Sequence, residues 1–488
     1  MDLFQILTSS AWSILMIALF FGGSIFVHEL GHFWVARKRG VKVDRFSIGF
    51  GPAIFKWTGK DGVEYRLSWL PLGGYVALPQ LADMRGLEGE PNAEVAALPS
   101  PNYTTRMLVF GAGAFMNVVF AFALATILWK AGLPTSADMQ RAKIGHVLPE
   151  IELPDGRKVA SPAATAGLRV GDTITAIDGV PVTTWDEMRQ MLFTGSGRDA
   201  QGDPQAALTV RRGEETLILS ARPVLAGDER MRMLGVSPFE QLKVGQIEPG
   251  SVAEKTGLLP GDVLWSLDGV VLTSGQLYVA GLRAQPSRPS ELVVERGGQK
   301  VTLAVPARPE AKEAAELGVL FEPEIVMLHR SPWAQITDNV KMTFRTLGSL
   351  LNRDSDIGIS KLSGPIGIAR VFHITAQTDI RYVLWFTIIV NVNLAIFNLL
   401  PLPVLDGGHM LFATIGKLRG KALPAGFIQA AQSVFVAALL SMMLYVSFFD
   451  VRRIARDAKA EEPAKEKPDA PSGPAAQPES LPAVVPVK

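Results

Sequence analysis

The sequence predicts a polytopic α-helical membrane protein with about four transmembrane helices and two inserted α+β domains. The first observation is that hydrophobic residues, 48% of the 488, concentrate in four long stretches without charges. A bilayer crossing needs about 20 predominantly apolar residues, so each stretch is long enough to span. The second observation is that short strands, turns and ordinary charge density occupy the region between the second and third stretches, where one sequence unit occurs twice.

Composition narrows the classes of function. Lys and Arg number 48 and Asp and Glu number 47, so the overall charge does not favour nucleic acid as a partner. The absence of cysteine excludes disulfides and thiolate metal ligands. The expected segments, in chain order, are transmembrane helix 1–36, a loop with a β-hairpin in 37–105, transmembrane helix 106–130, soluble domains 140–230 and 231–325, an amphipathic helix 330–352, transmembrane helices 382–408 and 422–450, and a disordered tail 457–488.

The first stretch lacks the basic start of a cleavable signal peptide, which favours a retained membrane helix. It ends in His28-Glu29-Leu30-Gly31-His32. On a helix His28 and His32 share one face, so both imidazoles can bind one Zn²⁺ ion, with Glu29 beside it. Such an ion needs a third protein ligand and keeps a position for water, whose proton a carboxylate can accept. The motif predicts peptide hydrolysis, and chance is a poor alternative because ionisable residues at membrane depth are usually functional.

The loop after the first stretch contains two short segments with the pattern of strands. Residues 63–70 alternate, a turn follows at Gly73-Gly74, and a second strand is expected in 75–78. The pair is either a plain surface hairpin or an edge near the site that pairs with an unfolded substrate backbone. The second interpretation makes Gly73 and Gly74 candidate substrate-binding residues.

Small residues in the second stretch, Gly111, Gly113 and Ala114, would allow another helix to approach closely. Asn117 supplies one polar group in the same stretch. Bracing a neighbouring helix and acting at the site are equally good interpretations of this residue.

The internal repeat organises residues 140–325. Its second copy follows at an offset of 90 residues, from Ser161-Pro162-Ala163 to Ser251-Val252-Ala253, from Gly171-Asp172 to Gly261-Asp262, and from Ile177-Asp178-Gly179 to Leu267-Asp268-Gly269. The first copy carries an insertion at about 150–160. These units resemble PDZ domains of the bacterial protease type, which bind chain termini or extended peptides by strand addition. Peptide binding and the exclusion of large substrates fit the pair equally well.

The end of the third stretch supplies a candidate for the third metal ligand. Pro401 and Pro403 must break the helix, and Asp406 follows at the edge of the apolar run, where a carboxylate needs a partner. Considered alone, Asp406 would be a turn residue facing the cytoplasm. Because two histidines require a third ligand and no cysteine exists, we expect Asp406 to be that ligand, with His409 as a weaker competitor.

Basic residues predict the orientation. Arg37-Lys38-Arg39 follows the first stretch at once, and the positive-inside rule places this loop in the cytoplasm and the soluble domains on the opposite side. Lys417, Arg419 and Lys421 precede the fourth stretch and agree with this orientation. Arg452, Arg453 and Arg456 disagree, since four crossings place them outside.

Four features together resemble the site-2 protease family, in its bacterial regulator-of-sigma-E type with tandem PDZ domains. They are the His28-Glu29-Leu30-Gly31-His32 motif, the paired repeats, Leu362-Ser363-Gly364-Pro365-Ile366-Gly367-Ile368-Ala369, and the run from Asn398-Leu399-Leu400-Pro401 to Asp406-Gly407. The resemblance covers nearly the whole chain apart from the tail. One departure is Ala114, which stands where family members often have proline in a Gly-Pro-x-x-Asn motif.

The resemblance implies a zinc ion held by His28, His32 and Asp406, with Glu29 as the catalytic base. It implies that Asn398 and Asn393 hold the substrate backbone near the site. Substrates would be membrane-spanning segments, either anti-sigma factors already trimmed by another protease or signal-peptide remnants, cut in the second step of regulated intramembrane proteolysis.

The expected location is the bacterial inner membrane, with the PDZ-like domains on the periplasmic side and the metal site towards the cytoplasm. Two other interpretations are a catalytically inert membrane adaptor that binds partners through its PDZ-like units, and a metalloprotease acting on soluble proteins. The complete motif disfavours the first of these, and its position inside an apolar stretch disfavours the second.

Overall fold

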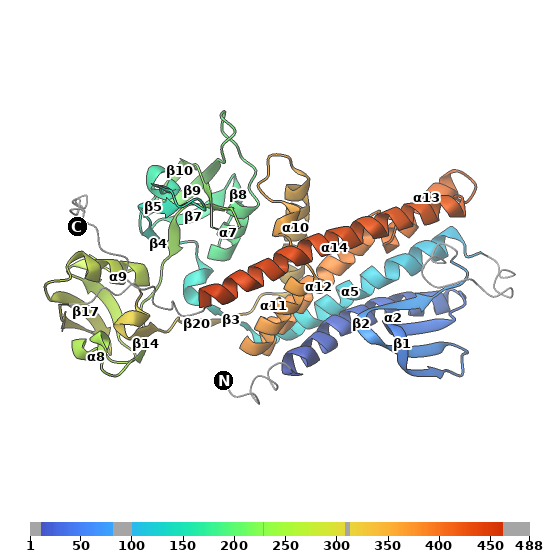
Figure 1. Ribbon diagram of the computed structural model, residues 1–488, viewed down its shortest axis with the longest axis horizontal. Coiled ribbons are helices and arrows are strands. Elements are labelled where there is room, and N and C mark those ends of the chain that lie inside the picture. Colours follow the sequence, from blue (N-terminus) through green and yellow to red (C-terminus); the bar gives the residue numbers. More distant parts are fainter. Residues whose placement is uncertain (1–10, 82–99, 228, 308–312, 462–488) are drawn as a thin grey trace.

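The computed structural model describes residues 11–81, 100–227, 229–307 and 313–461 (Figure 1). Within them, four helices are long and apolar enough to cross a membrane: Ala11–Lys38, Tyr103–Ala131, Ile380–Leu399 and Ala425–Asp457. Sheet-rich units occupy the chain between the second and third of these helices. The predicted class, a membrane protein with inserted β-containing domains, is therefore confirmed.

The first helix contains a π-helical turn, η1 (Ile17–Phe21), followed by α2 (Gly22–Lys38), so it ends two residues later than expected. The second, α5 (Tyr103–Ala131), begins after Asn102, whose side chain accepts a hydrogen bond from the Thr105 N–H and so caps the helix. Residues 1–10 lie outside the described part.

Helices α2 and α5 approach each other closely through glycines. A Cβ at Gly31 would lie 2.9 Å from Met116 Cγ and closer still to the Ala112 carbonyl oxygen, and Gly113 has a similarly crowded position. Small residues permit such contacts between membrane helices. Gly111, in contrast, would meet nothing within 4 Å, so its expected role in close packing is wrong within the described residues.

The third span is shorter than expected, because α12 (Ile380–Leu399) ends before Pro401. Residues 400–405 are irregular, and a helix that the sequence analysis did not expect, α13 (Asp406–Leu418), begins at Asp406. Gly407 and Gly408 make the turn possible, since Cβ atoms there would collide with the backbone of residues 399–403. The expected helix 382–408 is thus two helices with a break between them.

The fourth span belongs to α14 (Ala425–Glu461), which is longer than the expected 422–450. Residues 457–461 are helical, so the expectation of disorder from 457 is wrong for them, and 462–488 lie outside the described part. Two shorter helices precede these spans: α10 (Pro332–Leu351), in the segment expected to be amphipathic, and α11 (Pro365–Thr378), which was not expected.

Buried polar contacts join α14 to the Leu362–Ala369 motif. Asp450, 2% exposed, accepts hydrogen bonds of 2.9 Å from the N–H groups of Gly364 and Gly367 at the start of α11. The amide groups at a helix N-terminus favour an anion at this point. Side chains at either glycine would collide with Asp450, whose carboxylate oxygens lie 2.8 Å from the position of each Cβ.

Two of the three arginines that conflict with the positive-inside rule, Arg453 and Arg456, form ion pairs with other parts of the protein, whereas Arg452 is exposed. Arg453 pairs with Asp450 and Glu229 and donates to the carbonyls of Ser360 and Leu362, and Arg456 pairs with Glu229. These guanidinium groups join α14 to the first soluble unit, so their position has a structural reason that the positive-inside rule does not consider. The C-terminal end of α14 lies beside the soluble units (Figure 1).

The loop after α2 forms two long strands, β1 (Arg45–Thr58) and β2 (Glu64–Ala77). The expected pairing of 63–70 with 75–78 is wrong, because both halves of β2 pair with β1 instead of with each other. Arg45 faces both Glu64 and Ala77, so the start of β1 lies between the two halves. Residues 74–77 are consequently an edge segment, with one strand neighbour among the described residues.

The two soluble units have matching sheets. The first has strand order β10-β9-β7-β8 and the second β18-β17-β15-β16, which is the same path in chain order. The bounds in the first are β7 Thr173–Ile177, β8 Val180–Pro181, β9 Ala206–Arg212 and β10 Glu215–Ala221, and in the second β15 Val263–Leu267, β16 Val270–Val271, β17 Ser290–Arg296 and β18 Gln299–Val305. Helices α7 (Trp185–Phe193) and α9 (Gly275–Ala284) occupy equivalent positions.

Short strands complete each unit. The pairs are β4 (Ile144–Val147) with β13 (Val236–Pro238) and β14 (Val244–Ile247) with β19 (Val319–Phe321). The first unit therefore extends to Pro238, beyond the expected boundary at 230. Its insertion folds as a hairpin of β5 (Glu150–Glu152) and β6 (Lys158–Ala160). Each unit has its own apolar core.

Ionic contacts attach the first unit to the loop after α10. Arg232, whose side chain is 1% exposed, lies 2.7 Å from Asp356, and Arg198 pairs with the same carboxylate at 2.7 Å. At the base of the two units, β3 (Leu133–Ser136) pairs with β20 (Ile325–Leu328). The units lie at one end of the helices, whereas β1, β2 and α13 lie at the other (Figure 1).

The Gly-Asp step of the repeat has the same function in both copies. Asp172 and Asp262 accept hydrogen bonds from the N–H groups three residues earlier, at Arg169 and Leu259, and pair with Arg212 and Arg296 respectively. Burial alone would raise the pKa of Asp262, but the hydrogen bonds from Arg296 and Leu259 outweigh it and lower this pKa. The charged carboxylate therefore stabilises the folded unit.

We expect Asp262→Asn to destabilise the second unit by about 1–3 kcal/mol, because Asp262 is buried and an amide cannot accept both of the hydrogen bonds that Arg296 donates to it. Amide hydrogen exchange of β15 and β17 in the full-length protein measures the loss. The depressed pKa makes the stabilisation complete above the ordinary Asp pKa of about 3.9 and removes it as pH falls through the folded value.

The matched control is Asp155→Asn, because Asp155 and Arg157 form an exposed pair of small expected value. Equal exchange in the two variants at pH 7 would contradict the prediction. So would a difference between Asp262→Asn and wild type that stays constant down to pH 3.

Candidate metal centre

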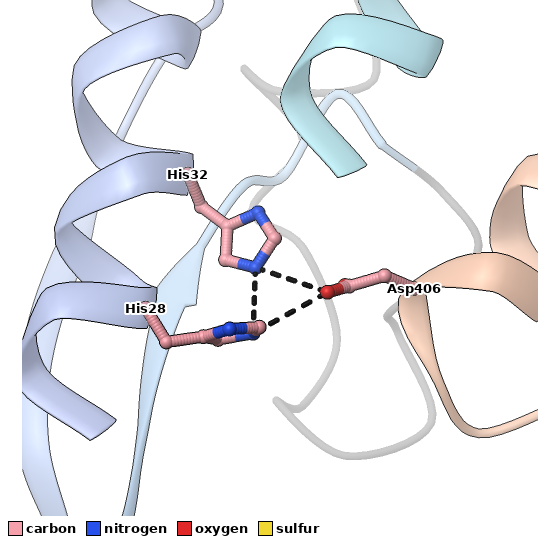
Figure 2. A group of neighbouring side chains, drawn as sticks. All are labelled: His28, His32 and Asp406. Atoms are coloured by element: carbon pink, nitrogen blue, oxygen red, sulfur yellow. Dashed lines mark hydrogen bonds and ion pairs between the residues drawn. The ribbon is translucent and has the colours of Figure 1, made fainter. Parts of the chain in front are cut away.

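Three expected ligands from two distant parts of the chain converge. His28 and His32 lie one turn apart on α2, and Asp406 is the first residue of α13 (Figure 2). The two Nε2 atoms are 3.1 Å apart, and Asp406 Oδ2 lies 3.3 Å from His28 Nε2 and 3.4 Å from His32 Nε2. The three atoms form a nearly equilateral triangle, with all three side chains pointing to its centre.

This triangle fits zinc. Two atoms bonded to a tetrahedral Zn²⁺ at about 2.0–2.1 Å lie about 3.3–3.4 Å from each other. The three separations in the structure are 3.1, 3.3 and 3.4 Å. Two imidazoles and one carboxylate are a common catalytic zinc ligand set and leave a fourth position open.

The charges of the site also favour a cation. Asp406 and Glu29 are acidic, and no Lys or Arg forms an ion pair with either in the described residues. Anions removed from water are costly unless they are paired. A divalent cation between the imidazoles and Asp406 would supply the missing charge.

The carbonyl of Val109 on α5 orients His32. It lies 2.7 Å from His32 Nδ1, and a carbonyl can only accept, so Nδ1 carries the proton. The lone pair is then on Nε2, the atom that faces Asp406. In metal-binding histidines, a hydrogen bond from the ring nitrogen that does not face the metal fixes the tautomer, and the Val109 carbonyl provides this bond for His32.

Asn117 plays the same part for His28. Its amide, fully buried on α5, lies 3.2 Å from His28 Nδ1, while its buried Oδ1 accepts no hydrogen bond among the described residues. Turning the amide by 180° lets Oδ1 accept the Nδ1–H of His28, which directs the Nε2 lone pair to the metal. A role at the site is therefore the better interpretation of Asn117.

The backbone at Gly113, called the floor of the site below, is the surface of α5 on which both imidazoles pack. A Cβ there would lie 2.8 Å from His28 Nε2 and closer to His32 Nε2, so the imidazoles rest directly on the backbone of α5. Sequence analysis identified Gly113 as a packing residue and did not connect it with the ligands. The signal was present in its spacing, four residues before Asn117 on one face of the helix.

The side chain of Glu29, which belongs to α2, packs against the strand β2. A Cβ at Gly74 would be 3.0 Å from Glu29 Cγ and 2.9 Å from the Ser47 carbonyl oxygen, so β2 passes directly over the glutamate. Gly74 pairs with Ile48 of β1 and begins the edge segment 74–77. The structure thus brings one of the two predicted hairpin glycines to Glu29, and the other, Gly73, is its neighbour in the chain.

The remaining candidates lie apart from the triangle. Asn393 accepts a hydrogen bond of 2.5 Å from Thr343 on α10, and His409 stacks on Phe110 with ring centroids 5.1 Å apart. Asn398 is partly buried on the last turn of α12. In the described residues, no hydrogen bond connects Asn393 or Asn398 to the three ligands or to Glu29. His409 is likewise absent from the ligand group.

Comparison with known proteins extends these observations to the whole chain. The family model described as peptidase family M50 matches residues 16–442. The regulator of sigma E protease of Salmonella typhi is 32% identical over 473 residues, covering 90% of this chain and 99% of that protein. The regulator of sigma-E protease RseP of Escherichia coli K12 is 31% identical over 471 residues, with the same coverage.

A third relative, from Vibrio cholerae, carries the words zinc metalloprotease in its name. It is 29% identical over 477 residues, which are 92% of this chain and 100% of that protein. The match runs from the histidine pair through both soluble units to Asp406, and the resemblance to site-2 proteases is confirmed: this chain belongs to peptidase family M50.

Proposed function

We propose that this chain is an intramembrane zinc metalloprotease that hydrolyses peptide bonds within or near transmembrane segments, as the second cut in regulated intramembrane proteolysis. The observation that carries the proposal is the triangle of His28, His32 and Asp406, with Glu29 beside it, among helices long enough to span a bilayer. The relatives are named as regulators of sigma E, which supports an anti-sigma factor as the substrate class. Signal-peptide remnants are a second proposed class.

The chain's residues divide the chemistry between them. When bound, Zn²⁺ supplies a Lewis acid that polarises the scissile carbonyl and lowers the pKa of a water molecule. His28, His32 and Asp406 hold the ion, and Val109 and Asn117 fix the two imidazoles. Glu29 accepts the proton of the attacking water and delivers it to the leaving amine.

The edge segment 74–77 is the proposed binding site for the substrate backbone. A helical substrate has its carbonyls in hydrogen bonds, so it must unwind before one of them can be attacked. An extended segment can then add to the edge segment 74–77 of β2, and Gly74 places that segment beside Glu29. Asn398 and Asn393 remain candidates for further contacts with the substrate.

The proposed location is the bacterial inner membrane. Exposed apolar side chains on the spans, such as Phe115, Ile127 and Leu444, are suited to contact with lipid. Arg37 and Lys38 end α2 at the side of the metal triangle, whereas the soluble units lie at the opposite end (Figure 1). By the positive-inside rule this supports periplasmic units and a metal site towards the cytoplasm.

An inert adaptor is the alternative from another class of function. It would need no aligned ligands, yet all three ligands and Glu29 are present, and α5 supplies an orienting partner to each imidazole. Binding of partners by the soluble units is compatible with catalysis and is not an argument against it.

Glu29→Gln should abolish cleavage and leave zinc binding unchanged, because the amide cannot accept the proton but removes no ligand. The expected loss is about 10²–10⁴-fold. The measurement is cleavage of a single-span substrate in detergent, with zinc content determined for both proteins. A variant that cuts at the wild-type rate would exclude Glu29 as the base, and a wild type that binds zinc without cutting any single-span substrate would favour the adaptor.

Gly113→Ala should lower zinc content and activity together, by tenfold or more, since its methyl group would occupy space against both imidazoles. Gly111→Ala is the matched control: it makes the same change two residues away, where nothing lies within 4 Å. Equal zinc content in the two variants would show that the floor of the site tolerates a side chain.

Removal of the soluble units tests their role as a size filter. Ser136 and Ile325 are strand partners, so a short Gly-Ser linker can join the two ends left by the removal of 137–324. We expect the shortened protein to cut a substrate with a bulky outer domain at least tenfold faster than the full chain does. Loss of cleavage of a trimmed substrate would instead identify the units as required peptide-binding modules, and Glu29→Gln in the same background controls for other proteases.

A further inference from the structure

A buried polar contact joins α2 to α12 away from the ligands. Asn391 Nδ2 donates a hydrogen bond of 2.7 Å to Ser24 Oγ and another of 2.9 Å to the Thr387 carbonyl. Ser24 and Asn391 are both fully buried. Neither residue belongs to the motifs that the sequence analysis used.

Ser24 stands on the histidine face of α2. It precedes His28 by four residues and His32 by eight, so the three side chains lie along one side of the helix. Its hydroxyl also donates to the Phe20 carbonyl at 2.6 Å, at the end of the π-helical turn η1. Ser24 is therefore fixed both to its own helix and to α12.

The distances within the metal triangle depend on the axial position of α12 relative to α2. Two ligands are on α2, whereas Asp406 follows α12 after a short break held by Gly407 and Gly408. Both helices pack along α5. Sliding α12 by 1 Å relative to α2 would carry Asp406 out of the range that a zinc ligand tolerates, which is a few tenths of an ångström.

Apolar packing alone fixes such a displacement weakly, since lipid tails and apolar side chains are similar surroundings for a membrane helix. A hydrogen bond has a narrow range of length and angle, and a buried amide without its partner is costly. The Asn391–Ser24 contact is suited to fixing the axial position of α12 against α2.

We propose that Asn391 and Ser24 are positioning residues for the metal centre: their hydrogen bond sets the axial register of the two helices and so holds Asp406 at bonding distance from the ion bound by His28 and His32. This inference rests on the proposed zinc site. It assigns no contact of Asn391 or Ser24 with the metal or substrate.

The test measures zinc affinity of the full-length protein in detergent by competition with a chelator. Asn391→Leu, which keeps the number and branching of the side-chain heavy atoms and removes the amide, should weaken zinc binding by about tenfold, within the range known for residues that support metal ligands. Ser24→Ala should have a similar effect, and the double variant should lose no more than either single variant, since all three lack the same bond. kcat should fall with KM unchanged.

Thr387→Val is the control, because Thr387 is equally buried on α12 but its hydroxyl bonds within its own helix, to the Val383 carbonyl. A purely structural role would lower the melting temperature of the zinc-free protein in Asn391→Leu and Thr387→Val alike and leave zinc affinity unchanged in both. That result, or additive losses in the double variant, would overturn the proposal. If Asn391→Leu does not fold, Ser24→Ala decides alone.

The same measurement separates this inference from the proposed function. A wild-type protein that binds zinc, with variants that bind it equally well, overturns the positioning role and leaves the metalloprotease intact. A wild-type protein that binds no zinc overturns both.

Discussion

The contact between α2 and α5 at Gly31 and Gly113 is the constraint on which the metal centre depends. It lets the backbone of α5 lie directly against both imidazoles, so that a carbonyl and an amide of α5 reach the two Nδ1 atoms. Each histidine then presents Nε2 to the same point. With bulkier residues the helices would separate, the orienting contacts would lengthen, and the same His-Glu-x-x-His sequence would no longer form a preorganised site.

Sequence reasoning succeeded where the chemistry is local or where one residue type is scarce. The spacing of His28 and His32 on a helix predicted two side chains that face one point, and the lack of cysteine together with the broken third span indicated Asp406 as their partner; the structure brings the three side chains together. It failed where distant segments meet. The start of β1 separates the two halves of β2, so a turn that looked sufficient for a hairpin does not make one, and the pairing of Asn391 with Ser24 involves helices some 370 residues apart in the chain.

Arg453 and Arg456 illustrate a different limit. The positive-inside rule counts basic residues near membrane ends and does not distinguish free charges from paired ones. Here Glu229 from the first soluble unit and Asp450 from α14 neutralise the guanidinium groups that contradicted the four-span topology. The exception is explained by tertiary contacts that no local window of sequence contains.

The separation of the ligands along the chain has a consequence for biosynthesis. At roughly 5–20 residues per second, the ribosome adds Asp406 on the order of 20–70 seconds after His32. During that interval the first two spans and both soluble units can fold, yet the nascent chain has only two of its three ligands. A protease that acts on membrane segments is thereby kept inactive beside the translocation machinery, where many unassembled spans are exposed, until its own third span is in place.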